Sequence, residues 1–161
     1  MKSKTNLTAI LILSGATLAS SAVLAAGSVQ VSESVELNAK PAAIWALVGD
    51  YNGLYRWHPA VKDSKRTDNV RLLTLGNGAQ ITETLIVMDN EKHSYNYTIN
   101  ASPLPVSDYE SSIAVKANGN NSSIVTWSSS FNATGTSNEE AAQVIRGVYQ
   151  AGLNKLTELY N

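Results

Sequence analysis

Hydrophobic and polar residues alternate along most of the chain between residues 29 and 133, which is the pattern of half-buried strands. The first alternating run covers 29–37 and is followed by a helical pattern over 38–50. Pro41 fits an early position of that helix, where its missing N–H costs nothing. A second short helix is expected over 52–57, so two short helices follow the first strand directly.

Turn signals divide the next part of the chain into strands. Asn77-Gly78 is a strong hairpin signal, and the tripeptides 89–91 and 118–120 are two more. The segments between these turns predict an antiparallel meander with strands over 70–75, 79–88, 93–101, 107–117 and 122–132, preceded by a weaker edge strand over 61–69.

A long amphipathic helix is predicted at the end of the chain. Ser137 and Glu140 have the spacing of a capping box, and no proline interrupts 137–160. The element order therefore predicts an α+β helix-grip fold, in which a curved antiparallel sheet of about seven strands wraps on this helix. The apolar positions of the long helix are Ala141, Val144, Ile145, Val148, Gly152, Leu156 and Leu159.

The N-terminal residues have the pattern of a secretory signal peptide. Two lysines precede an apolar run over 7–13, and small residues continue to Ala25 and Ala26. Serine and threonine residues interrupt the run before it reaches the roughly 20 residues of a membrane span. We expect cleavage after Ala25, with Ala26 as the alternative, so that 1–25 is the signal and 26–161 is one domain in the periplasm or outside the cell.

Composition narrows the classes of partner. Removing 25 of the 161 residues leaves 136, which suits one domain with one core. That part has 10 basic and 13 acidic residues with the signs interspersed, so neither nucleic acid nor an anionic membrane is indicated as a partner. The chain has no cysteine, and His58 and His93 lack metal-ligand spacing. We therefore expect neither a metal nor a cofactor.

Glu83 is the one charge in an otherwise apolar inward row of the strand over 79–88. Burying a carboxylate without a partner is costly, so the group pairs or protonates. Two explanations are open. Glu83 forms an ion pair with an arginine such as Arg56 or Arg71, or it serves a ligand or an acid–base reaction.

The same alternation places Tyr95, Tyr97, Tyr109 and Trp127 on the inward rows of the following strands. A buried tyrosine hydroxyl needs a hydrogen-bond partner, and several of them beside a glutamate are easier to satisfy around a wet or ligand-filled cavity. The alternative is that the hydroxyls reach the rim of the sheet.

Two glycines lie inside the long helix, where each costs about 1 kcal/mol relative to alanine. Gly152 is on the apolar face, where it makes room for a ligand or for close approach of the sheet. For Gly147, the explanation is that the helix simply tolerates a glycine at this position.

Three segments resemble the START-like polyketide cyclase/dehydrase and lipid-transport superfamily. They are the helix pair at 39–59, with Ala-Lys-Pro-Ala-Ala-Ile-Trp and Tyr-Arg-Trp-His-Pro, the loop at 102–109, and the helix segment at 151–156. The resemblance covers 29–161 and implies the helix-grip fold. It implies no single function, because that superfamily includes carriers, cyclases and hormone receptors.

Within the superfamily, the plant abscisic-acid receptors are similar without gaps from Ile44 to about Met88. The resemblance puts His58 where those receptors have a ligand-contacting lysine, although the alternative is a rim residue beside Pro59. It also puts Glu83, Tyr109 and Trp127 at pocket positions. The two receptor mouth loops fall on Leu75, Gly76 and Asn77, and on Pro103, Leu104 and Pro105, but neither loop motif survives, so hormone reception is not implied.

The predicted function is binding of an apolar or amphipathic small molecule in an internal cavity by an exported protein. One alternative is a cyclase or dehydratase that uses Glu83 with His58 or Tyr109. Another is a periplasmic accessory protein that acts through protein partners, because exported members of similar size include one in methanol oxidation. The predicted ligand-binding residues are His58, Glu83, Tyr95, Tyr97, Tyr109, Trp127, Val148 and Gly152.

Overall fold

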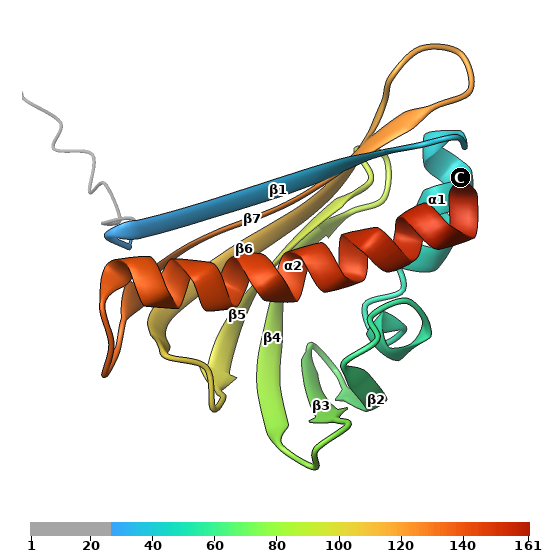
Figure 1. The fold of residues 1–161 in the computed structure, drawn as a ribbon. Helices are drawn as coiled ribbons and strands as arrows, with labels where there is room; N and C mark the ends of the chain where they lie inside the picture. The colour runs from blue at the N-terminus through green and yellow to red at the C-terminus, as the bar shows by residue number, and fades with distance from the viewer. Residues whose placement is uncertain (1–26) are drawn as a thin grey trace, which may run out of the picture.

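The computed structural model describes residues 27–161, and the signal peptide predicted for 1–25 lies outside the described residues. The chain forms one strand, two short helices, six strands and one long helix, as the sequence pattern predicts (Figure 1). The helices are α1 (Pro41–Val48), the 3-10 helix η1 (Leu54–Arg56) and α2 (Asn138–Tyr160). None of the described helices has the length and apolar character that a membrane crossing needs.

Seven antiparallel strands form a single sheet in the order β1-β7-β6-β5-β4-β3-β2. Every strand from β2 to β7 pairs with its neighbour along the chain, which is the predicted meander, and β1 closes the sheet against β7. The strands are β1 (Val29–Leu37), β2 (Val61–Thr67), β3 (Val70–Leu75), β4 (Gln80–Asp89), β5 (Ser94–Ala101), β6 (Val106–Ala117) and β7 (Ser123–Ala133).

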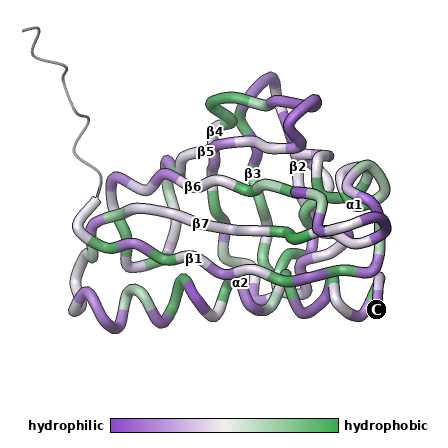
Figure 2. Tube along the Cα trace, turned by 90° about the horizontal axis from the view of Figure 1, so that it is seen from above, coloured by the Kyte–Doolittle hydropathy of each residue, from purple (hydrophilic) through white to green (hydrophobic). Residues whose placement is uncertain are grey.

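The long helix α2 lies across one face of the curved sheet (Figure 1) and runs beside β1 when the molecule is seen from above (Figure 2). Ser137 and Glu140 form the predicted capping box at its start. These features confirm the α+β helix-grip fold. The core fills the space between the sheet and the helices, and α1 contributes the buried residues Ile44, Trp45 and Val48.

The buried face of α2 differs from the predicted one. Val144 and Leu159 were expected inside but are 42% and 49% exposed, whereas Tyr149 and Leu153 are buried. The aliphatic pattern placed the centre of the face too far from Tyr149, whose ring stacks on Trp127 with centroids 4.5 Å apart. Tyr149 belongs to the core, but it was not counted among the apolar positions because of its polar hydroxyl.

A second difference lies at the end of β4, where the inward row was expected to continue to Val87. A bulge between Leu85 and Val87 shifts the register against β5, so that Val87 pairs with Asn96. The alternation changes sides there, and the Val87 side chain is 53% exposed.

Candidate ligand-binding site

An internal cavity of about 80 Å³ lies between α2, the η1–β2 segment and the inward face of β3 to β7. Most of its wall is apolar, and the polar groups on it come from a histidine, a glutamate and two tyrosines. The lining residues are Leu54, His58, Ala60, Val61, Leu73, Leu75, Ile81, Glu83, Tyr97, Ile99, Leu104, Tyr109, Trp127, Ile145 and Val148.

The carboxylate of Glu83 is paired with Arg71, which resolves the choice of partner between Arg56 and Arg71. These residues are directly opposite on β4 and β3, and Nε of Arg71 lies 2.6 Å from Oε2 of Glu83. Both side chains are buried. Arg56 instead forms an ion pair with Asp50 near the surface.

Tyr51 completes what we call the charged cluster, which consists of Tyr51, Arg71 and Glu83. The guanidinium of Arg71 donates a hydrogen bond to the Tyr51 carbonyl and lies 3.9 Å from the centre of the Tyr51 ring. Burial raises the pKa of the Glu83 carboxyl, and the charge and hydrogen bond of Arg71 oppose that shift. Burial is the largest single influence on Arg71 and lowers its pKa. The Glu83 carboxylate, together with Tyr95, Tyr51 and Tyr97, raises it by more, so the pKa of Arg71 lies above its ordinary value.

Only one oxygen of Glu83 is bonded to Arg71. The other carboxylate oxygen receives no hydrogen bond from residues 27–161, and Glu83 is part of the cavity wall. The charged cluster therefore presents an unused hydrogen-bond acceptor to the cavity.

A second polar cluster, which we call the hydroxyl network, consists of the hydroxyl groups of Tyr109, Ser111 and Tyr149. It lies where β6, β7 and α2 border the cavity. Ser111 donates its one proton to the Ser128 carbonyl at 2.8 Å, because a carbonyl oxygen only accepts. In the 3.2 Å contact between Ser111 and Tyr149, the Tyr149 hydroxyl is therefore the donor. Tyr149 has no second proton, so Tyr109 donates to it. Because its proton is used in this bond, Tyr109 can offer only its lone pairs to the cavity.

Trp127 joins the hydroxyl network to Tyr97. Its indole N–H donates to the Tyr97 hydroxyl at 3.0 Å and to the Ser111 hydroxyl at 3.1 Å. The Tyr97 oxygen accepts in this contact, and its own proton has no acceptor among the residues that the structure describes. Because Tyr97 lines the cavity, it supplies a free donor there.

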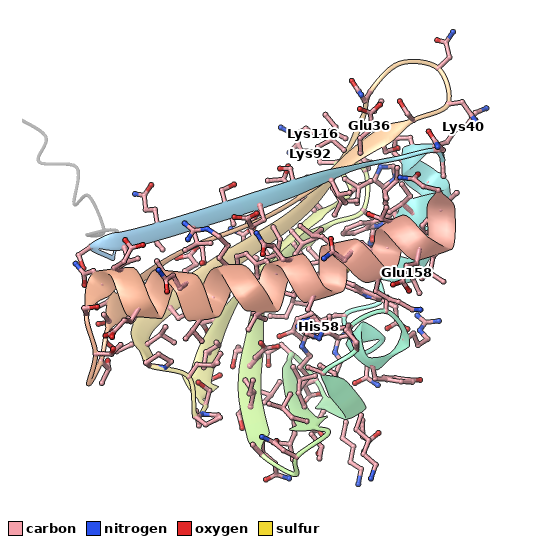
Figure 3. The ribbon with its side chains drawn as sticks, viewed as in Figure 1. Glu36, Lys40, His58, Lys92, Lys116 and Glu158 are labelled. Carbon is pink, nitrogen blue, oxygen red and sulfur yellow. The ribbon has the colours of Figure 1, made fainter. Side chains whose placement is uncertain are left out.

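His58 contributes its ring to the wall but has no free nitrogen. Its Nε2 donates to the Val148 carbonyl at 2.9 Å, and its Nδ1 accepts from the Ala60 N–H at 3.3 Å. This pair of contacts requires the neutral ring protonated at Nε2. Burial lowers the pKa of His58, although the bond to Val148 opposes the shift. His58 therefore links the segment before β2 to α2 through the hydrogen bond to Val148 (Figure 3).

Gly152 serves close packing and is not part of the cavity wall. A Cβ at this position would lie 2.9 Å from His58 Cδ2, 2.9 Å from Trp57 Cζ3 and 3.0 Å from Trp127 Cζ3. Of the two explanations for Gly152, close approach is therefore the one that the structure supports. A Cβ at Gly147 would meet nothing within 4 Å, consistent with simple tolerance.

The structure brings six of the eight predicted ligand-binding residues to one cavity, namely His58, Glu83, Tyr97, Tyr109, Trp127 and Val148. Tyr95 is buried elsewhere, against Trp45 and Tyr51. Alternation along β5 predicts that the Tyr95 side chain points inward, but it does not predict how far that side chain lies from the cavity.

The predicted mouth loops divide in the same way. Leu75 and Leu104 line the cavity, whereas Gly76 and Asn77 border a separate hollow on the surface. Pro103 and Pro105 border neither. Sequence reasoning missed the aliphatic wall, because residues such as Leu73, Ile81 and Ile145 have the same pattern as any core residue.

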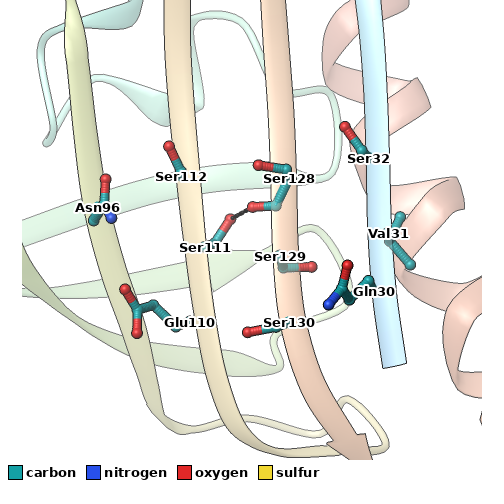
Figure 4. A pocket seen from close by; sticks show the side chains of 10 residues that line it. All are labelled: Gln30, Val31, Ser32, Asn96, Glu110, Ser111, Ser112, Ser128, Ser129 and Ser130. Carbon is teal, nitrogen blue, oxygen red and sulfur yellow. Dashed lines mark hydrogen bonds between the residues drawn. The ribbon is translucent and has the colours of Figure 1, made fainter. Parts of the chain in front are cut away.

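A wider hollow of about 400 Å³ lies on the outer face of the sheet (Figure 4). Small hydroxyl side chains border it, among them Ser32, Ser112, Ser128 and Ser130. It is open to solvent and contains none of the predicted site residues. Small-molecule sites are usually enclosed and mainly apolar, so the internal cavity is the better candidate.

Comparison with known proteins identifies the class that this fold and cavity define. Residues 28–160 match the family described as polyketide cyclase / dehydrase and lipid transport, and the chain belongs to this family. No curated protein sequence matches the chain significantly.

Similar solved structures include two from Bacillus. XoxI from Bacillus cereus is 35% identical, with a TM-score of 0.80 over 82% of this chain and 95% of that one. An uncharacterised protein from Bacillus thuringiensis is 34% identical, with a TM-score of 0.79 over 81% and 97%. The Zhui aromatase/cyclase from a Streptomyces species is 14% identical, with a TM-score of 0.68 over 81% and 92%, and shares the fold.

Proposed function

We propose that the protein is exported and binds an apolar or amphipathic small molecule in the cavity between the sheet and α2. The observation that carries this proposal is the cavity wall itself, which is mainly apolar and includes a few polar side chains. That combination is typical of small-molecule sites. Family membership supports the same proposal, and export rests on the N-terminal sequence pattern.

The size of the cavity limits what this conformation accepts. Its 80 Å³ exceeds the space that one water needs, but a cavity that holds benzene has about 150 Å³. Even a single ring therefore requires the rim to yield. The half-buried apolar residues of the wall come from β3, β5, the loop after β5 and α2, and they are Leu75, Ile99, Leu104 and Val148. We infer that a ligand enters by displacing these side chains.

Binding is better supported than the cyclase or dehydratase chemistry considered for the same residues. Both nitrogens of His58 are engaged by the backbone, and the proton of Tyr109 is held by Tyr149. Glu83 is thus left without the second acid–base group that the reaction was expected to use. Its free oxygen serves equally well to anchor a ligand.

Native mass spectrometry of the protein purified from its own host tests the proposal. We expect a co-purifying molecule that is released on denaturation. Val148→Phe should abolish this species by filling the cavity, whereas Val144→Phe, one turn earlier and 42% exposed, should retain it. Repeated absence of any bound molecule in the wild-type protein would overturn the proposal and favour a protein that acts through its surface.

A further inference from the structure

The polar groups on the cavity wall have a fixed hydrogen-bonding pattern. Glu83 presents an unused acceptor oxygen, and Tyr97 presents an unused proton. Tyr109 presents lone pairs only, because the hydroxyl network takes its proton. The site therefore offers one donor and two acceptors to whatever occupies it.

Glu83 and Tyr97 are neighbours on the cavity wall. Glu83 is paired with Ile99 and Tyr97 with Leu85, so the two are diagonal neighbours on the inward face of β4 and β5. Both line the 80 Å³ cavity, and no hydrogen bond joins them. Burial raises the pKa of Tyr97 and the charge of Glu83 raises it further, so this hydroxyl stays protonated.

The charge of the cluster is already balanced. Arg71 neutralises Glu83 at 2.6 Å, and neither Arg71 nor any other lysine or arginine of the described residues lines the cavity. A carboxylate ligand would face the Glu83 oxygen without a cation, and a ketone would leave that oxygen unpaired. An ammonium ligand would meet the proton of Tyr97. A neutral group that both donates and accepts pairs with Glu83 and with Tyr97 and adds no charge to the cavity.

We propose that the ligand carries a neutral hydroxyl group, as an alcohol or a phenol, which donates to Glu83 and accepts the proton of Tyr97. This inference rests on the proposed function of the cavity. Tyr97 is then a specificity-determining residue. It leaves binding of the apolar part unchanged and discriminates between ligands with and without the hydroxyl group.

Phenol and toluene are the probes that test this inference, because they differ only by a hydroxyl in place of a methyl group. Their dissociation constants are measured by two-dimensional NMR titration of the ¹⁵N-labelled protein. Toluene leaves a buried donor and acceptor unpaired, so we expect phenol to bind about 5-fold more tightly or better. Tyr97→Phe should weaken phenol about 5-fold and should not weaken toluene, because it removes the donor that toluene leaves unpaired.

Tyr95→Phe is the matched control, because Tyr95 lies on the same strand, is equally buried at 1% exposure and is not part of the cavity wall. It should preserve the ratio of the two affinities. Equal binding of phenol and toluene by the wild-type protein would overturn the hydroxyl inference and leave the proposed function standing. Binding of neither probe would overturn both. The wild-type ratio decides the matter even if a variant fails to fold.

Discussion

The cavity is bordered by two buried polar clusters, the hydroxyl network and the charged cluster. They differ in how many of their hydrogen-bonding atoms have a partner. The hydroxyl network begins at Tyr109 and ends on the Ser128 carbonyl, so every proton along it has an acceptor. In the charged cluster, Nη2 of Arg71 and the Tyr51 hydroxyl have no partner among residues 27–161, and one oxygen of Glu83 is free. The network therefore offers the cavity only the lone pairs of Tyr109, whereas the cluster has unpaired donors as well as an unpaired acceptor.

The largest expected effect comes from breaking the charged cluster. Glu83→Leu leaves the Arg71 cation buried and unpaired, which should lower the free energy of unfolding by about 3–5 kcal/mol. Replacing both residues, as Arg71→Met with Glu83→Leu, should recover most of that loss because no charge remains buried. Urea denaturation of the three proteins measures this difference. A single variant as stable as the wild type would contradict the described ion pair.

Two glycines of α2 provide the next test, because they have opposite surroundings on one helix. Gly152→Ala forces a Cβ against three aromatic rings and should destabilise the protein by about 1–3 kcal/mol. Gly147→Ala meets open space and should stabilise it by about 1 kcal/mol through helix propensity. Thermal unfolding followed by circular dichroism measures both. Shifts of the same sign would show that α2 does not pack on the sheet as described.

The hydroxyl network should respond more weakly than the charged cluster, because it carries no charge. Tyr149→Phe removes the acceptor of Tyr109 and the donor to Ser111, at an expected cost of about 1–3 kcal/mol. Urea denaturation measures it, with Tyr95→Phe as the control, whose hydroxyl is outside the network. A cost in Tyr149→Phe no larger than in the control would show that the network contributes nothing to stability.

The pattern of the sequence was sufficient for the fold because most elements have one clear period. Alternation over 29–133 and the helical spacing after Ser137 leave few ways to bury both apolar surfaces. The pattern failed where a local event changes the period. The bulge after Leu85 turns Val87 outward, and no residue type there signals it.

The candidate site was predicted only in part, for a different physical reason. Alternation gives the direction of a side chain, so Glu83, Tyr97 and Tyr109 were correctly placed inside. The partner of Glu83 depends on the register between β3 and β4, and residue types alone left Arg56 and Arg71 as equal candidates. Hydrogen-bond direction depends on full geometry, so the engagement of both His58 nitrogens was not foreseeable.

The smallest expected effect is a pH dependence from His58, which joins α2 to the rim of the cavity. Its pKa is lowered in the folded protein, whereas the unfolded chain has the ordinary value of about 6.5. Between these two values the unfolded state binds more protons, so this contribution to stability is complete above pH 6.5 and is lost as the pH falls toward the folded pKa. One proton limits the slope to about 1.4 kcal/mol per pH unit.

Glu83 opposes this trend, because a raised carboxyl pKa makes the folded state the stronger proton binder. The contribution of His58 is therefore isolated by difference. His58→Gln can still donate to the Val148 carbonyl but does not titrate, so its unfolding free energy should fall less than that of the wild type between pH 7 and pH 5. Urea denaturation at the two pH values measures both proteins. Parallel losses would mean that His58 takes up a proton in the folded protein as readily as in the unfolded chain, and this would contradict the backbone contacts at its two nitrogens.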